Sequence, residues 1–261
     1  MQDLCPDIVT YTLPYDAIIA IHGSRMLILN QAISLVSVPP GSFIYHIVGL
    51  FALEAAFAIS FSQYRRAPES EFGRFALAAG AALGFRVVLA ILAVLSIFGF
   101  ANESLLLPPL DRAVALSTFL LLGWAFLSRS DDMTGDIVLS IGLIVIAIGT
   151  VVALVLWSNV SASGIYYNNS THDLLWAAPQ VGLILGIIVM LLWRRPEDWD
   201  LGLGIFALAL SGTLLHLGFA LNMQILNGHI SAFTRMTDLA IFPMFALVMY
   251  RRVLRSTVVI V

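Results

Sequence analysis

Residues 73–100, GRFALAAGAALGFRVVLAILAVLSIFGF, decide the fold class of this chain. They are apolar or small except at Arg74, Arg86 and Ser96, and the run exceeds the ~20 residues that a helix needs to cross a bilayer. Arg86 lies near its midpoint, where an arginine costs about 2.5–3.5 kcal/mol unless it has a partner or an aqueous cavity. The stretch therefore predicts a transmembrane helix inside a bundle that satisfies a buried charge.

Composition extends this interpretation to the whole chain. Hydrophobic residues make up 60% and charged residues 11% of the sequence, and mean hydropathy is +0.95. A soluble domain carries about 25% charged residues. With 261 residues, the chain predicts an all-α integral membrane protein with a bundle of seven transmembrane helices.

Seven apolar runs form one expected domain over residues 42–255. The expected helices are 42–62, 75–99, 113–128, 137–157, 174–193, 201–221 and 235–250. Pro108 and Pro109 are expected to close a turn before the third helix. Residues 1–41 contain short, interrupted apolar runs and are predicted to form an extracytoplasmic cap or interfacial segment, with a pair of strands as the alternative. Residues 256–261 are the expected cytoplasmic tail.

Arginines in alternate loops predict the orientation, because positive loops stay cytoplasmic. One side carries nine arginines and the other carries three. The nine are Arg65, Arg66, Arg74, Arg129, Arg194, Arg195, Arg251, Arg252 and Arg255, and the three are Arg25, Arg112 and Arg235. We expect the N-terminus outside and the C-terminus in the cytoplasm.

Several function classes conflict with the sequence. All thirteen basic residues are arginine, so the lysine that a retinal Schiff base requires is absent and a rhodopsin is excluded. A net charge of -3 gives no basic patch for nucleic acid, and the single Cys5 allows no internal disulfide. Metal, phosphate-binding and nucleophile-elbow motifs are missing too, so we expect no metal and no enzymatic activity.

Two charged residues in the first two spans predict a buried ion pair. Glu54 and Arg86 lie at similar depth on consecutive antiparallel helices, and each would relieve the cost of the other. The pair either fixes the register of the helices or changes its protonation with a stimulus. The sequence leaves both interpretations open.

A second polar group gathers near the predicted outer surface and predicts a cavity for a small ligand. Its members are His46, Trp176, Gln180, His216, Arg235 and Asp238. Arg235 and Asp238 have the alternative of a local pair three residues apart. We expect no cofactor; the alternative is a b-type haem between His46 and His216, which match in depth.

Four short motifs carry a resemblance to a known family. They are LPPLDRA at 107–113, GWAF at 123–126, RRPEDW at 194–199, and RMTDLA at 235–240 followed by Pro243. These stretches resemble the seven-helix membrane region at the N-terminus of bacterial sensor histidine kinases and GAF-domain signalling proteins. The resemblance implies a bacterial inner (plasma) membrane protein that senses a stimulus and passes it through its last helix to a cytoplasmic signalling partner.

The sequence therefore predicts a multi-pass sensor or receptor-like module that detects a small ligand or membrane stimulus. The chain contains no phosphoacceptor region or ATP-binding domain, so we expect either a truncated module or a stand-alone member that acts through another protein. The alternative is an integral subunit of a larger energy-converting or transport complex. In that case Gly80/Gly84 and Gly182/Gly186 would also contact partner chains.

Overall fold

The computed structural model describes residues 31, 41–68, 70–128, 133–221 and 229–258, and within them it contains seven long helices and no strand. The helices are α2 (Gly41–Arg66), α3 (Ser70–Ile97), α4 (Glu103–Leu127), α5 (Met133–Val160), α6 (Thr171–Arg194), α7 (Trp199–Leu221) and α8 (Ala232–Val258). Two 3-10 turns, η1 (Ser161–Ser163) and η2 (Tyr167–Asn169), connect α5 to α6. All seven helices are long and apolar enough to cross a membrane, which confirms the predicted all-helical, multi-pass class. The predicted cap over residues 1–41 lies outside the described residues, apart from 31 and 41.

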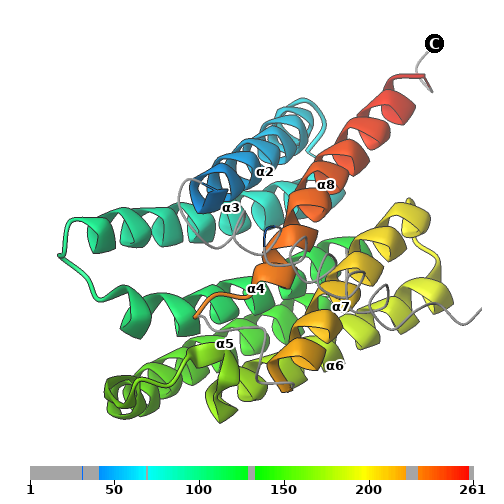
Figure 1. Cartoon of the computed structure of the whole chain (residues 1–261). Coiled ribbons are helices and arrows are strands. Elements are labelled where there is room, and N and C mark those ends of the chain that lie inside the picture. The colour runs from blue at the N-terminus through cyan, green and yellow to red at the C-terminus, as the bar shows by residue number, and fades with distance from the viewer. Residues whose placement is uncertain (1–30, 32–40, 69, 129–132, 222–228, 259–261) are drawn as a thin grey trace, which may run out of the picture.

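Contacts between the helices close a circuit through six of them. α2 packs on α3 and α8, α3 on α4, α4 on α6, α6 on α7, and α7 on α8. We call this set the six-helix ring. α5 packs on α4 from outside, and Figure 1 shows it at the edge of the bundle. Burial agrees with this arrangement, since 72% of the apolar window of α4 is buried but only 11% of the apolar window of α5.

Close helix contacts depend on small residues and aromatic rings. A Cβ on Gly123 would lie 2.4 Å from the Ile187 side chain, so a larger residue would have to displace Ile187 where α4 meets α6. Beside this contact, the Phe126 ring meets Phe75 of α3 at 5.4 Å and Phe245 of α8 at 6.4 Å between ring centroids. Lipid is as apolar as these side chains, so their close fit stabilises the bundle through dispersion more than through exclusion of water.

The third transmembrane helix begins ten residues earlier than predicted, and its two prolines lie inside it. Asn102 caps α4 by accepting a hydrogen bond from the Leu105 N–H, and the helix then runs through Pro108 and Pro109. Pro108 lacks the N–H that would bond the Ser104 carbonyl, and the Trp157 indole of α5 donates to that carbonyl at 2.8 Å instead. The expectation that this segment is a turn was therefore wrong, because a tertiary contact satisfies the carbonyl that proline releases.

The last helix is also longer than predicted. α8 extends to Val258, eight residues past the expected end at 250, and its C-terminal end projects beyond its neighbours in Figure 1. This extension carries Arg251, Arg252 and Arg255.

We expect Trp157→Phe to lower the stability of the protein by about 1 kcal/mol through the lost hydrogen bond, and further through the space left by the smaller ring. Thermal unfolding in detergent measures the change. Trp193→Phe is the matched control, because Trp193 is 79% exposed at the surface of α6. Equal melting temperatures for the two variants would contradict the role assigned to Trp157.

Candidate functional site: a buried charge network

Nine polar side chains form a connected set inside the bundle, which we call the charge network. The members are Tyr45, Arg86, Asp111, Arg112, Asn168, Asp173, His216, Arg235 and Asp238, and all nine are buried. Each helix of the six-helix ring contributes at least one member, whereas α5 contributes none. Three arginines face three aspartates, so the formal charges balance when His216 is neutral. Balance is a physical requirement here, since an unpaired charge in this environment is costly.

One end of the network joins α8 to α2 and α3. The Arg86 guanidinium donates to Asp238 Oδ2 at 2.7 Å through Nη2 and to the Tyr45 hydroxyl through Nη1. Tyr45 in turn donates to the same Asp238 oxygen at 2.9 Å. The guanidinium carbon also lies 5.1 Å from the centroid of the Phe242 ring, one helical turn beyond Asp238. Three helices therefore share one carboxylate.

The centre of the network is Asp111 of α4, which lies among three arginines. Arg112 Nη1 is 3.4 Å away, Arg235 Nη2 is 3.6 Å away and Arg86 Nη1 is 4.0 Å away. The Arg235 guanidinium also stacks over the Tyr45 ring, with 4.8 Å from its carbon to the ring centroid. The Asp111 carboxylate thus links the two halves of the network.

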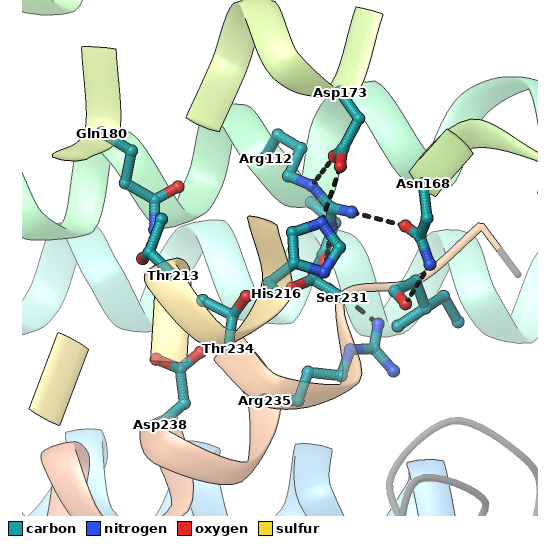
Figure 2. Close-up of polar contacts among 12 residues, drawn as sticks. Arg112, Asn168, Asp173, Gln180, Thr213, His216, Ser231, Thr234, Arg235 and Asp238 are labelled. Carbon is teal, nitrogen blue, oxygen red and sulfur yellow. Dashed lines mark hydrogen bonds and ion pairs between the residues drawn. The ribbon is translucent and has the colours of Figure 1, made fainter. Parts of the chain in front are cut away.

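The other end joins α4 to α6, α7 and the connection before α6. Figure 2 shows Arg112 extended between Asp173 and Asn168, to which it donates at 2.7 and 2.8 Å. Asp173 also meets His216 Nε2 at 2.6 Å. Asn168 extends the network by donating a hydrogen bond to the Ile230 carbonyl just before α8. The network therefore also reaches the chain two residues before the start of α8.

A small cavity opens beside the network. Its volume is about 200 Å³, and its polar lining comes from His46, Glu103, Asp111 and Arg235. Apolar side chains of α2, α3 and α4 form the remaining wall. We call this the network cavity. Because Asp111 and Arg235 belong to both, a molecule in the cavity would touch the charges that hold α8.

The predicted pair of Glu54 and Arg86 is wrong, because Arg86 pairs with Asp238. Glu54 is exposed on the surface of α2, whereas Tyr45, which does bond Arg86, is buried. Nine residues separate the two positions, and nine steps of 100° place them on opposite faces of the helix. Tyr45 and Glu54 are also about 13.5 Å apart along the axis of α2, so the contact of Arg86 with α2 differs from the predicted one in depth as well as in rotation.

The predicted outer group divides into separate environments. His216, Arg235 and Asp238 join the charge network, and His46 lines the network cavity with Arg235. Trp176 lines another cavity of about 300 Å³ between α4, α5 and α6. Gln180 donates to the Thr213 hydroxyl at 2.9 Å and so joins α6 to α7.

The histidines considered for haem have different surroundings. The Nε2 atom of His216, which an axial ligand would offer to iron, is engaged by Asp173, whereas His46 lies at the network cavity. These contacts do not present the two imidazoles as a pair of axial ligands. A hydrogen-bonded role for His216 is the simpler account.

The network members missed from the sequence are Tyr45, Asp111, Arg112, Asn168 and Asp173. Two prolines precede Asp111 and Arg112, and this pattern predicts a turn at both residues. A helix-start signal was present at 102–103, since Asn102 is a good N-cap and Glu103 follows it in the first turn. Weighting that signal above the prolines would have placed both charges inside a helix.

A second ionic group, which we call the terminal cluster, holds the other end of α8. Arg252 donates to Asp198 Oδ2 at 3.1 Å, to the Glu197 carbonyl at 2.8 Å and to Glu71 at the start of α3. Arg251 and Arg255 also contact Asp198, at 3.2 and 2.9 Å. Both ends of α8 are therefore fixed by ion pairs, with Pro243 between them.

No protein-family model, curated protein or solved structure matches this chain. Its functional interpretation therefore rests on the geometry of the site.

A double-mutant cycle tests the pair that joins α3 to α8. We expect Arg86→Gln and Asp238→Asn each to destabilise the protein by about 3–5 kcal/mol, because each leaves a buried charge without its partner. The double variant should lose less than the sum of the two. Urea or thermal unfolding in detergent gives the three values. Glu54→Gln is the control and should change stability by under about 0.5 kcal/mol.

Acid should loosen the loop contact beside the network. His229 Nδ1 accepts a hydrogen bond from the Tyr167 N–H at 3.2 Å, and burial lowers the pKa of His229 below its ordinary 6.5. Its neutral form is favoured in the folded state, so this contribution is complete above about pH 6.5 and is lost as pH falls through the lowered pKa.

Melting temperatures between pH 7.5 and 5 for wild type and His229→Asn provide the measurement. The asparagine oxygen can accept the same bond without titrating, so the variant should lose less stability than wild type on acidification. Parallel pH profiles would contradict the assignment.

Proposed function

We propose that this protein is a sensor or receptor-like module of a bacterial plasma membrane, in which a small ligand in the network cavity changes the packing of α8. It acts by binding, and it relays the change to a cytoplasmic partner. One observation carries the proposal: the cavity shares Asp111 and Arg235 with the network that fixes α8. A ligand shifts such an equilibrium by its difference in affinity for the two arrangements.

The cavity indicates the kind of ligand. Apolar side chains such as Leu89, Ala93 and Leu107 form most of its wall. Its polar atoms come from His46, Arg235 and the carboxylates of Glu103 and Asp111. A volume of about 200 Å³ suits a small molecule with an apolar body and one polar or anionic group. An anion would compete with Asp111 for the Arg235 guanidinium and so alter a bond that α8 makes to α4.

α8 is suited to carry the change across the membrane. It contacts α2 and α7 along its length, and ion pairs hold it at the network and again at the terminal cluster. A shift at Asp238 must therefore be accommodated at Arg252 or at Pro243 between them. With the N-terminus outside, as the arginine distribution favours, the terminal cluster faces the cytoplasm, where the resemblance to histidine-kinase membrane regions places an output partner.

Filling the network cavity with a side chain tests the proposal without a known ligand. Spin labels at Trp193→Cys and Tyr250→Cys, in a Cys5→Ser background, report the distance between α6 and α8 by pulsed electron paramagnetic resonance. Ala93→Phe should place a ring in the cavity and shift this distance by about 1–2 Å or change its distribution.

Ala153→Phe is the matched control, since Ala153 lines the separate cavity between α4, α5 and α6. It should leave the distance unchanged. Adding Arg235→Gln to Ala93→Phe should reduce the shift, because the ion pair between Asp111 at the cavity and α8 is then removed. A folded Ala93→Phe protein with the wild-type distance would overturn the sensor proposal.

A second candidate, a subunit of a larger membrane complex, is favoured by the uncovered surface of α5. Only 11% of its apolar window is buried, and Cβ atoms built on Gly182 and Gly186 of α6 would meet nothing within 4 Å. Such surfaces suit partner helices as well as lipid. Purification from native membranes in gentle detergent, with an absorption spectrum and an intact mass, distinguishes the two. Partner subunits or pigments at fixed stoichiometry would favour the complex, and a colourless single chain would favour the sensor.

A further inference from the structure

A second polar feature lies away from the charge network, at the end of the bundle that carries the terminal cluster. A groove of about 590 Å³ runs between α2, α3, α4 and α5. Its lining residues are Phe57, Phe61, Tyr64, Gly73, Arg74, Ala76, Leu77, Gly80, Ala81, Trp124 and Asp136. We call it the lateral groove. The groove contains both a cation and a carboxylate.

Arg74 is the cation of this groove. It is only 7% exposed, and it forms no ion pair or hydrogen bond with any residue in the described ranges. Its guanidinium carbon lies 5.8 Å from the centroid of the Trp124 ring, which orients it but does not neutralise it. A buried arginine of this kind needs an acceptor, and phosphate matches its planar set of donors.

Asp136 is the carboxylate of the same groove. Its Oδ1 accepts a hydrogen bond from the Trp124 indole at 2.9 Å, and this contact fixes its position at the start of α5. No contact between Asp136 and Arg74 lies within 4.0 Å. The groove therefore presents one separate positive and one separate negative group, joined through the same tryptophan.

The polar residues lie at the depth expected for lipid head groups. Arg74 and Asp136 are four and three residues from the starts of their helices, and Trp124 is three residues from the end of α4. These separations correspond to about 4.5–6 Å along each helix axis. Exposed apolar side chains continue the groove deeper into the bilayer, with Phe61 at 41% and Leu77 at 58% exposure. An acyl chain would lie against them.

Glycines on α3 shape the wall of the groove. A Cβ on Gly73 would lie 3.0 Å from the Tyr64 ring, and one on Gly80 would lie 3.1 Å from the Phe57 ring. The two rings therefore lie directly on the α3 backbone, seven residues apart on one face. This arrangement makes a firm aromatic wall beside Arg74.

We propose that the lateral groove binds a zwitterionic phospholipid with a primary amine, of the phosphatidylethanolamine type. Its phosphate bonds Arg74, its ammonium bonds Asp136, and one acyl chain lies along Phe61 and Leu77. Charge complementarity selects this head group, since an anionic lipid would meet Asp136 without a matching cation. A choline head group has no N–H groups and so cannot donate a hydrogen bond to Asp136.

Native mass spectrometry of the detergent-purified protein, titrated with lipids of identical acyl chains, tests this site. The lipids are phosphatidylethanolamine, phosphatidylglycerol and phosphatidylcholine. Wild type should bind the first about tenfold more tightly than the other two, the effect of one charge-assisted hydrogen bond. Arg74→Gln should weaken binding of all three. Asp136→Asn, which keeps an acceptor for the Trp124 indole, should remove only the preference for phosphatidylethanolamine.

Arg195→Gln is the matched control, because Arg195 lies over the Trp199 ring at 5.5 Å at the same end of the bundle but outside the groove. It should bind lipid as wild type does. Arg74→Lys keeps the charge and should retain part of the binding if Arg74→Gln fails to fold. Equal binding of phosphatidylglycerol and phosphatidylethanolamine by wild type, or displacement of lipid by inorganic phosphate, would overturn the proposal.

Discussion

The bond between Arg86 and Asp238 is the interaction on which the rest of the structure depends. A guanidinium and a carboxylate inside a bilayer are stable only together, so the helices that carry them must meet with a defined rotation and depth. Tyr45 adds a third helix to the same oxygen. Through Asp111 and Arg112, the requirement for paired charges spreads to every helix of the six-helix ring.

The distribution of paired charges gives the helices different structural roles. α4 is the most buried helix and carries Asp111 and Arg112, which connect the two ends of the network. α8 closes the ring against α2 and α7, and it is the helix that ion pairs hold at both ends. α5 takes no part in the network, yet its Trp157 satisfies the carbonyl that Pro108 releases and its Asp136 faces the lateral groove.

Arginine and aspartate occur both in the interior and at the lipid-facing surface, but they are arranged differently in the two places. Inside, arginines and aspartates neutralise one another at 2.7–4.0 Å. At the lateral groove, Arg74 and Asp136 remain apart, and the proposed zwitterionic lipid would pair with both. The same distinction separates a structural ion pair from a binding site. In a structural pair the two charges neutralise each other, whereas in a binding site they are available to a ligand.

The sequence by itself determined the seven helices, because length and hydropathy are local properties and the bilayer sets their threshold. It also showed that Arg86 needs a partner, and it identified Arg235, Asp238 and His216 as polar groups of the bundle. Only the tertiary structure decided that the partner is Asp238 and not Glu54, because hydropathy shows which segments cross the bilayer but not how one helix is rotated and shifted against another. It likewise placed Asp111 and Arg112 inside α4, since an indole from a neighbouring helix, rather than the local sequence, satisfies the backbone that proline leaves open.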